Sequence, residues 1–284
     1  MSLSGSAGLA GVIGWPVAQS LSPALHGHWL SEYGVDGAYL PLAIRPEDFA
    51  RAVEGLLLAG FSGFNVTIPH KEAAFALAAY HDDAAKLIGA VNLLLARDGV
   101  LEGRNTDAYG LAATLDQELG AGALRGKTVA IWGAGGTTRA AICALAQLGV
   151  AEIRLFNRTP DKAAALAKSF AGKIAPKLSA SGYEGWSGKE VALVVHTTSA
   201  GMKQTPSLTL ALDEMPSNAA VFDVVYNPLE TGLLAQARTR GLKAVDGLWM
   251  LLHQAVPSFE AFYGITPKVT PALRQALEKA LGHG

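Results

Sequence analysis

Short apolar runs alternate with longer Ala- and Leu-rich segments along the first 120 residues of the chain. The runs are too short for helices, which favours strands. Several of the longer segments begin at or near a proline, a residue well suited to the first turn of a helix. The alternation predicts an α/β domain with its own sheet. Predicted strands are 10–13, 38–43, 63–68 and 91–96, and predicted helices are 23–33, 46–58, 70–79 and 109–119.

Residues 127–157 have the clearest pattern in the chain. An apolar, β-branched run at 128–132 is followed by glycines, then by an Ala/Leu-rich segment at 139–148 and a second apolar run at 152–157. Strand, glycine turn, helix and strand within about 30 residues form a βαβ unit. Glycines at such a turn let a pyrophosphate approach the backbone and bind the free N–H groups of the helix. We therefore expect a dinucleotide at Gly133, Gly135 and Gly136.

The alternation continues to the end of the chain. Further strands are expected at 192–196, 221–225 and 243–245, and helices at 246–263 and 270–281. Thr270 followed by Pro271 is typical of a capped helix start. With 284 residues, the chain is long enough for two domains.

The end of the second strand of the βαβ unit indicates which dinucleotide binds. An NAD site carries Asp or Glu roughly 20 residues past the glycine loop, where it binds the ribose 2′-hydroxyl. Asn157, Arg158 and Thr159 stand there instead. The Arg158 guanidinium suits phosphate oxygens, and no carboxylate would repel a 2′-phosphate, which favours NADP. The alternative is that Arg158 is a solvated charge and that Thr159 caps the helix starting at Pro160.

Composition excludes several other classes of protein. Half of the residues are hydrophobic, 17% are charged and the net charge is −1, so no basic stripe suggests nucleic acid. No apolar run of membrane-spanning length and no signal peptide is evident. The single cysteine, Cys143, lies among Ala and Leu and suits a core position in a cytoplasmic protein. No metal site is expected, because His26 and His28 would diverge on a helix.

Polar residues gather where strands of the first domain are predicted to end, which is where α/β sheets bind ligands. Hydroxyl and amide side chains with one Lys/Asp couple suit a polyhydroxylated molecule and the movement of one proton. Each residue also has a structural alternative, such as a helix cap for Ser22, a dipole partner for Asp107 or a solvated position for Lys71. The residues are Ser20, Ser22, Asn65, Thr67, Lys71, Asn92, Asn105 and Asp107.

With these residues in order, the chain resembles the shikimate dehydrogenase family from about residue 11 to 267. The motifs that carry the resemblance include Ser-Leu-Ser-Pro (20–23), Asn-Val-Thr-Ile-Pro-His-Lys (65–71), Gly-Arg-Asn-Thr-Asp-Ala-Tyr-Gly (103–110) and Gly-Ala-Gly-Gly-Thr-Thr-Arg (133–139). Shorter matches lie at 89–92, 157–159, 225–228 and 246–255. The resemblance implies NADPH-dependent, reversible reduction of 3-dehydroshikimate to shikimate, in the biosynthesis of chorismate and the aromatic amino acids.

The resemblance also implies a fold and residue roles. A substrate domain (1–107 and 246–284) and a Rossmann domain (108–245) would flank a cleft, as a monomer or homodimer that binds a small-molecule substrate. Lys71 and Asp107 would be the catalytic pair. The substrate would contact Ser20, Ser22, Asn65, Thr67, Asn92, Tyr226 and Gln254. NADP would contact Gly133, Ala134, Gly135, Gly136, Thr137, Asn157, Arg158, Thr159, Thr198, Val224, Gly247 and Met250.

Four residues depart from the family pattern. Thr138 is larger than the usual glycine or alanine, His196 stands where the family usually has Asn, and Gln19 replaces a frequent His or Asn. Trp249 occupies a place where the family commonly has glycine. Two alternatives therefore stay open: a quinate/shikimate-type enzyme with a related substrate, and a non-catalytic dinucleotide-binding regulator, for which loss of the Lys71/Asp107 couple would be the mark.

Overall fold

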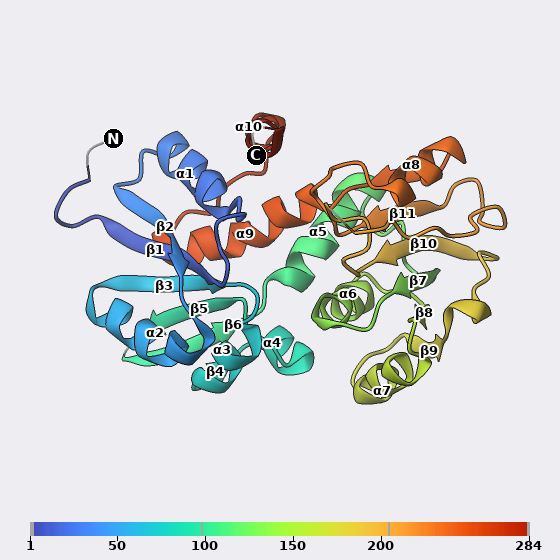
Figure 1. Ribbon diagram of the computed structural model, residues 1–284, viewed down its shortest axis with the longest axis horizontal. Helices are drawn as coiled ribbons and strands as arrows, with labels where there is room; N and C mark the ends of the chain where they lie inside the picture. The colour runs from blue at the N-terminus through green and yellow to red at the C-terminus, as the bar shows by residue number, and fades with distance from the viewer. Residues whose placement is uncertain (1–2, 98, 204, 283–284) are drawn as a thin grey trace. The chain divides into compact units, whose positions relative to one another are not determined.

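The computed structural model describes residues 3–97, 99–203 and 205–282, which form two compact units. Unit 1 comprises the chain up to Thr106 together with the segment from Leu252 onward, and unit 2 comprises Asp107–Leu251. Each unit contains a six-stranded sheet (Figure 1). Residues 1, 2, 283 and 284, the outer limits of the predicted domains, lie outside the described residues.

The sheet of unit 1 is mixed, with strand order β2-β1-β3-β5-β6-β4. Strand β1 pairs in parallel with β2 and β3, whereas β5 runs antiparallel to both β3 and β6. The antiparallel strand reverses the direction of the chain, so that the amino end of β5 lies at the same edge of the sheet as the carboxyl end of β3. The strands are β1 (Gly8–Gly14), β2 (Gly37–Ala43), β3 (Phe61–Val66), β4 (Tyr80–His81), β5 (Leu93–Arg97) and β6 (Val100–Arg104).

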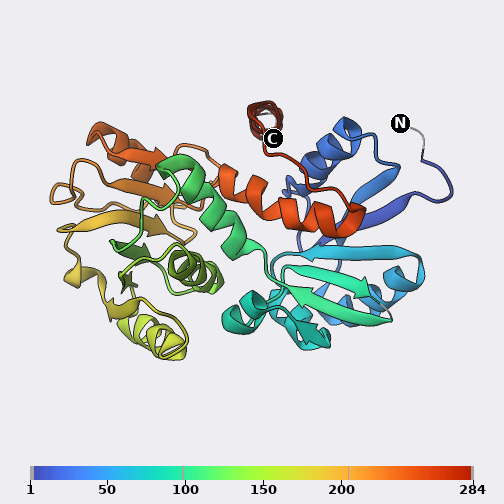
Figure 2. The same cartoon turned by 180° about the vertical axis from the view of Figure 1, so that it is seen from behind.

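Helices cover this sheet and bring the end of the chain back to unit 1. Helix α1 packs against β1 and β2, α10 packs against α1, and α2 packs against β3. Figure 2 shows α9, of which Leu252 onward belongs to unit 1, and then α10 closing the chain. The helices are α1 (Ser22–Glu32), α2 (Phe49–Leu58), α3 (Lys71–Leu77), α4 (Asp83–Ile88), α9 (Leu248–Tyr263) and α10 (Pro271–Gly282), with a 3₁₀ turn at Pro46–Asp48.

The sheet of unit 2 is parallel throughout, with order β12-β11-β10-β7-β8-β9. Numbered within the unit, this is the 3-2-1-4-5-6 order of the Rossmann fold, and the order of strands reverses between β7 and β10. Residues 129–132 of β7 are almost fully buried, as an apolar strand between two helical layers should be. The strands are β7 (Thr128–Trp132), β8 (Glu152–Phe156), β9 (Lys177–Ser181), β10 (Val191–His196), β11 (Ala220–Asp223) and β12 (Lys243–Val245).

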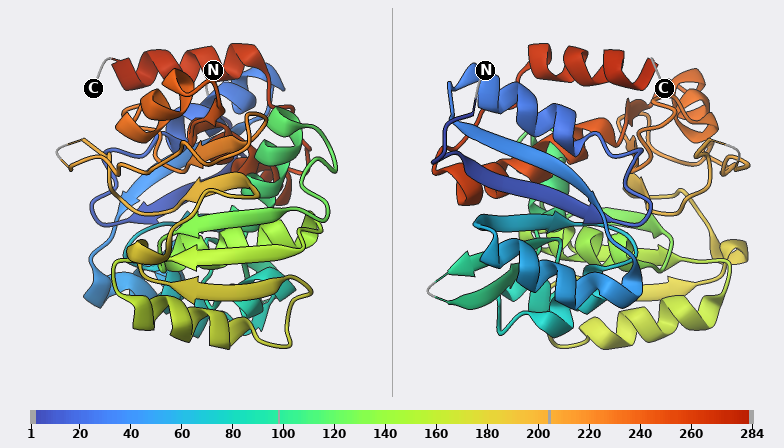
Figure 3. Two further views of the ribbon diagram at one scale, coloured as in Figure 1. Left: turned by 90° about the vertical axis from the view of Figure 1, so that its right-hand side faces the viewer. Right: turned by 60° about the vertical axis from the view of Figure 1, so that its left-hand side comes forward.

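Helices lie along this second sheet as well. Helix α6 packs against β7 and α5, α7 packs against β8 and β9, and α8 packs against β11 and β12 (Figure 3). They are α5 (Asp107–Leu119), α6 (Gly136–Gln147), α7 (Pro160–Phe170) and α8 (Gly232–Thr239), with a 3₁₀ turn at Tyr183–Gly185. Cys143 is a buried residue of α6, as the sequence predicted, and burial raises the pKa of its thiol to about 11.

The predicted strands and helices are all present, with ends shifted by a few residues. Three strands and two helices were not predicted: β4, β6, β9, α4 and α8. Strand β9 reads Lys-Leu-Ser-Ala-Ser and is an edge strand with little buried surface, so it lacks an apolar signal. Helix α4 does carry signals, because the Asp82 side chain accepts from the backbone N–H of Ala85 and Gly89 ends the helix in the left-handed conformation.

Two predicted helix caps differ from the structure, and one is confirmed. Ser22 does not cap α1: it is the first helical residue, and Leu21 occupies the cap position. Thr159 occupies the cap position of α7, but its side chain makes no capping hydrogen bond. Thr270 caps α10, because its hydroxyl accepts from the N–H of Leu273. No helix within the described ranges is long and apolar enough to span a bilayer.

Candidate functional site

In unit 1, the predicted substrate-binding amides meet at one edge of the mixed sheet. Asn65 lies in β3 and pairs with Leu93, the first residue of the antiparallel strand β5. The predicted strand 91–96 placed Asn92 inside β5. In the structure Asn92 precedes β5. The Asn65 side-chain amide donates to the Asn92 carbonyl at 3.2 Å. The two amides therefore meet because β5 is antiparallel, not because both follow parallel strands.

Asn92 is the centre of a buried group of hydrogen bonds. Its Oδ1 accepts from the backbone N–H of Thr106 at 2.8 Å, and its Nδ2 donates to the Thr106 hydroxyl at 3.0 Å. Gln254, on α9, joins the group, with its Oε1 at 3.4 Å from Asn92 Nδ2 and 3.3 Å from Thr106 Oγ1. The contacts hold the amides of Asn92 and Gln254, which are 162 positions apart in sequence, side by side in unit 1.

The Asn65 side chain is also held by hydrogen bonds. Its Oδ1 accepts from the Tyr39 hydroxyl at 2.7 Å, and its Nδ2 also donates to the Ser258 hydroxyl at 2.8 Å. Burial raises the pKa of Tyr39 well above its usual value, and a hydrogen bond with Ser22 opposes that shift. Tyr39 is therefore a neutral phenol that donates to Asn65.

Ser20 lies between β1 and α1, and Ser22 is the first residue of α1, both beyond the carboxyl end of β1. The Ser20 hydroxyl accepts from the backbone N–H of Ser22 at 3.3 Å, so the two residues form one local turn. Ser22 is buried and Ser20 is half-buried.

Thr67 lies on the segment that joins β3 to α3, and Lys71 is the first residue of α3. His70, between them, is buried; its Nε2 lies 2.8 Å from the carbonyl oxygen of Ile44, and its ring stacks on Phe49 at 4.8 Å. The Lys71 carbonyl accepts from the N–H of Val91 at 3.0 Å. The backbone of Lys71 is thereby fixed beside the residue that precedes Asn92.

Asp107 follows Thr106 directly and is the first residue of α5. It is half-buried, as is Lys71. Lys71 belongs to unit 1 and Asp107 to unit 2, so their pairing remains a prediction.

In unit 2, the glycine loop between β7 and α6 has the shape that a dinucleotide requires. Gly133 has φ +130°, and a Cβ there would lie 2.4 Å from the Thr197 hydroxyl. Gly135 and Gly136 lie at the start of α6, where a Cβ would meet no other group within 4 Å. Because Gly135 and Gly136 have no side chains, the space over the first N–H groups of α6 is open. The loop therefore fits a pyrophosphate. Ala134 and Thr137 are half-buried members of the same loop.

Thr138, a departure from the family pattern, is fully buried beneath this loop. Its hydroxyl accepts from the N–H of Gly135 at 3.0 Å and contacts the hydroxyl of Thr197 at 2.8 Å. The larger side chain is thus accommodated by hydrogen bonds that tie the glycine loop to the segment after β10.

Asn157, Arg158 and Thr159 form the turn between β8 and α7. Asn157 Nδ2 donates to the Thr159 carbonyl at 2.9 Å, which fixes the turn locally. Arg158 is exposed at its tip. An exposed guanidinium just after β8, the strand next to β7, is suitably placed to bind a phosphate on the ribose.

Three further predicted cofactor residues follow β10, β11 and β12, the strands beyond the point where the strand order reverses. Thr198 lies two residues beyond β10, and the Val224 N–H donates to the His196 carbonyl at 3.1 Å. Gly247 lies so close to Val224 that a Cβ there would be 2.0 Å from its carbonyl oxygen. Gly247 is therefore a position that only glycine can occupy.

The remaining predicted residues of unit 2 are Tyr226, Trp249 and Met250. Met250 is buried, whereas Tyr226 and Trp249 are half-buried. Burial raises the pKa of Tyr226 above its usual value, so it too is a neutral phenol.

Sequence reasoning missed several residues that hold the site. Their partners lie 8 to 193 positions away along the chain, and no local pattern marks such pairs. They are Tyr39, Thr106 and Ser258 in unit 1, and Asp223 and Thr231 in unit 2. Within the described part of the chain, no group of His, Cys, Asp and Glu could hold a metal ion.

Comparison with known proteins agrees with this architecture. Residues 12–94 match the family described as shikimate dehydrogenase substrate binding domain, and residues 115–186 match that described as shikimate / quinate 5-dehydrogenase. The chain is 50% identical to the shikimate dehydrogenase (NADP(+)) of Paramagnetospirillum magneticum over 273 residues, which cover 96% of this chain and 98% of the relative.

Solved structures are similar over the same length. A shikimate dehydrogenase in complex with NADP+ superposes with a TM-score of 0.90 at 32% identity, covering 99% of this chain and 98% of that one. A quinate dehydrogenase from Corynebacterium glutamicum in complex with NAD superposes with a TM-score of 0.87 at 28% identity, covering 96% and 99%. The fold is thus common to enzymes named for either substrate.

Proposed function

The chain belongs to the shikimate dehydrogenase family, and from that premise we propose that it catalyses the reversible, NADP-dependent reduction of 3-dehydroshikimate to shikimate. This reaction is a step in the biosynthesis of chorismate and the aromatic amino acids. The relative that is 50% identical carries the NADP(+) name, which supports both the substrate and the cofactor.

The buried polar chain of unit 1 is the observation that carries the proposal. A ring with a carboxylate and several hydroxyls needs fixed donors and acceptors, and a buried amide is costly unless its hydrogen bonds are made. The hydrogen-bonded series from Tyr39 through Asn65 and Asn92 to Gln254 provides such groups in fixed positions.

Each of these groups has a proposed role toward the substrate. Ser20 and Ser22 would donate to the carboxylate, since a hydroxyl is a good donor to an anion. The hydroxyl groups of the ring would contact Asn65, Thr67, Asn92 and Gln254, with Tyr226 near the substrate.

Lys71 and Asp107 are the proposed catalytic pair. An ammonium group at Lys71 would donate a proton to the carbonyl oxygen during reduction, and the amine would take it back during oxidation. Asp107 would stabilise the charged form of Lys71 by its own negative charge. The Val91 N–H donates to the Lys71 carbonyl, and the Thr106 N–H donates to Asn92 Oδ1. These bonds fix the backbone at Lys71 and immediately before Asp107.

Unit 2 would hold the cofactor, and unit 1 the substrate. When bound, NADPH supplies the hydride that reduces the ketone carbon. The α6 N-terminus and the residues Gly133, Ala134, Gly135, Gly136 and Thr137 would bind the pyrophosphate. Asn157, Arg158 and Thr159 would bind the adenosine ribose and its 2′-phosphate, and Thr198, Val224, Gly247 and Met250 the nicotinamide side.

Replacing Arg158 by Ala tests the choice of cofactor. We expect NADP+ affinity to fall roughly 10- to 150-fold and NAD+ affinity to stay nearly unchanged, because a hydrogen bond to a charged group contributes about 1.5–3 kcal/mol. Dissociation constants for both cofactors are measured by titration calorimetry at one salt concentration.

Lys168→Ala is the matched control for Arg158→Ala. It removes one exposed positive charge from the last turn of α7, the helix that follows Arg158, and both affinities should stay near those of the wild type. Equal losses of NADP+ and NAD+ affinity in Arg158→Ala would mean that Arg158 supports the fold instead of reading the phosphate.

A quinate/shikimate-type enzyme is the second candidate function, favoured by the likeness to the quinate dehydrogenase structure. The proposal further includes a cytoplasmic location and a monomeric or homodimeric state. Sedimentation velocity of the purified protein measures the oligomeric state.

A further inference from the structure

A buried histidine and aspartate lie where the cofactor-binding strands of unit 2 end. His196 is the last residue of β10 and Asp223 the last residue of β11, and the two are paired in the sheet register. Both are fully buried, and His196 Nδ1 lies 2.9 Å from Asp223 Oδ1. His196 also pairs with Trp132 of β7, so it stands at the switch in strand order, where this fold binds its ligands.

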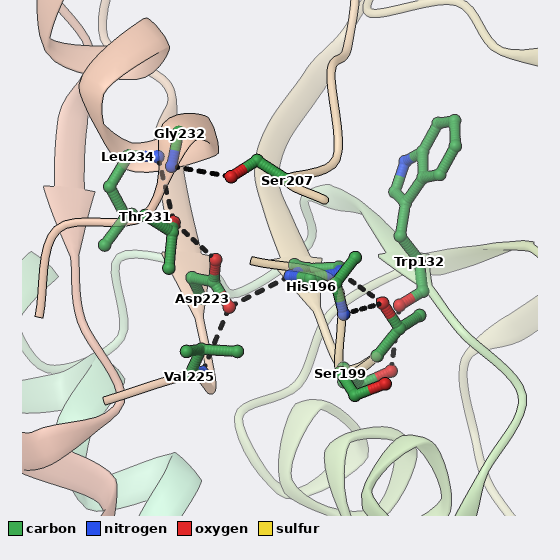
Figure 4. A network of polar contacts seen from close by, with 12 residues as sticks. Trp132, His196, Ser199, Ser207, Asp223, Val225, Thr231, Gly232 and Leu234 are labelled. Atoms are coloured by element: carbon green, nitrogen blue, oxygen red, sulfur yellow. Dashed lines mark hydrogen bonds and ion pairs between the residues drawn. The ribbon is translucent and has the colours of Figure 1, made fainter. Parts of the chain in front are cut away.

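The partners of Asp223 define which atom of His196 carries a proton. Asp223 Oδ1 also accepts from the N–H of Val225 at 3.0 Å, and its Oδ2 accepts from the Thr231 hydroxyl at 2.7 Å (Figure 4). A carboxylate surrounded by donors is an acceptor only. His196 Nδ1 must therefore be the donor in this pair.

The other ring nitrogen reaches the predicted cofactor residue Thr198. His196 Nε2 lies 2.5 Å from Thr198 Oγ1, which also accepts from the N–H of Ala200 at 3.1 Å. In the neutral imidazole with its proton on Nδ1, Nε2 is an acceptor, so the Thr198 hydroxyl donates its hydrogen bond to it. The oxygen of Thr198 then keeps one lone pair, and no proton, to offer to a ligand.

We propose that His196 and Asp223 are positioning residues that hold the Thr198 hydroxyl as a hydrogen-bond acceptor for a donor group of the bound dinucleotide, an amide N–H or a ribose hydroxyl. This inference rests on the proposed function, since it requires that unit 2 binds NADP. It gives a role to His196, which stands where the family usually has Asn. A carboxylate that orients a histidine, which in turn orients a ligand group, is a common arrangement in binding sites.

Two variants of His196 separate the role toward Thr198 from a purely structural one. Asn places its amide near the position of Nδ1, so His196→Asn keeps a donor for Asp223 and loses the contact with Thr198. Gln reaches the position of Nε2, so His196→Gln retains an acceptor for Thr198 and leaves Asp223 one donor short. Affinity is read as the NADP+ dissociation constant by calorimetry, and stability as the melting temperature without ligand.

The proposal predicts opposite results for the two variants. His196→Asn should weaken NADP+ binding about 3- to 10-fold, the value of one neutral hydrogen bond, with a melting temperature near that of the wild type. His196→Gln should lower the melting temperature but bind NADP+ within about twofold of the wild type.

A double-mutant cycle and a control complete the test. Thr198→Val should weaken NADP+ binding as much as His196→Asn, and the double variant should lose nothing further, because both residues act through one hydroxyl. Thr231→Val removes a donor on the far side of Asp223, so it should lower the melting temperature without a matching loss of affinity.

Several results would overturn the inference. They are a His196→Asn affinity within about twofold of the wild type, losses that add in the double variant, and a Thr231→Val variant that loses as much affinity as His196→Asn. Wild-type protein that binds no NADP+ would instead refute the proposed cofactor, and with it this inference. Wild-type binding combined with any of the three results refutes the inference alone.

Discussion

Lys71→Ala should lower kcat for shikimate oxidation at least 100-fold while the KM for shikimate changes much less. Proton transfer by a positioned group commonly contributes about 10²- to 10⁴-fold to the rate, and loss of uniform binding would appear in KM instead. Steady-state kinetics with shikimate and NADP+ measure both constants.

Two further variants show what Lys71 contributes. Lys71→Arg keeps the positive charge but cannot release a proton near neutral pH, so it should be nearly as slow as Lys71→Ala. Lys86→Ala removes an exposed lysine of α4 whose ion pair with Asp83 is worth little, and it should leave both constants near the wild-type values. A kcat for Lys71→Ala within about fivefold of the wild type would remove Lys71 from the mechanism.

A second large effect is expected from His26, a buried histidine of unit 1. Its ring stacks on Tyr39 at 3.8 Å, and among the described residues neither of its nitrogens has a hydrogen-bond partner. Burial lowers its pKa from 6.5 to about 3. The folded protein thus resists protonation of His26 at a pH where the unfolded chain accepts the proton.

This difference makes the protein less stable in acid. Since the pKa is lower in the folded state, the contribution of His26 is fully present above pH 6.5 and is lost as the pH falls from 6.5 toward 3. Each pH unit in that window costs about 1.4 kcal/mol of unfolding free energy, or about 5 kcal/mol in total. Urea unfolding followed by circular dichroism between pH 7 and pH 4 measures the loss.

His26→Phe keeps a planar ring against Tyr39 and removes the titrating group. Its unfolding free energy should fall by about 3 kcal/mol less than that of the wild type between pH 6.5 and pH 4. His28→Phe, two positions along α1 and half-buried, is the control and should follow the wild type. Identical pH dependence in the wild type and His26→Phe would show that burial of His26 does not control acid stability.

The sequence predicted the elements whose pattern is strong and local. Strand β7, the glycine loop and α6 follow one another within 20 residues, and each has its own signal: buried apolar residues, glycines and an Ala/Leu-rich helix. The polar edge strand β9 and the two-residue strand β4 have no comparable pattern, because pairing with a neighbour, rather than their own composition, makes them strands.

The candidate site shows the same division. Asn65 and Asn92 were predicted from their positions near strands, but the reason was incomplete, since the antiparallel direction of β5 is what brings them together. Tyr39 and Ser258 were missed because their hydrogen bonds to Asn65 join residues far apart in sequence. His196 was noticed only as a departure from a family pattern. Its partner Asp223 is 27 positions away and became evident only through the pairing of β10 and β11.

The central claim is that this chain oxidises shikimate with NADP+. The most direct measurement is the initial rate of the purified protein with shikimate and with quinate, each with NADP+ and with NAD+. We expect kcat/KM for shikimate with NADP+ to exceed those of the other three pairs by at least about tenfold. The 2′-phosphate contact favours NADP+ over NAD+, and the fixed polar groups of unit 1 favour shikimate over quinate. A higher kcat/KM for quinate with NAD+, or no activity with any pair, would contradict it.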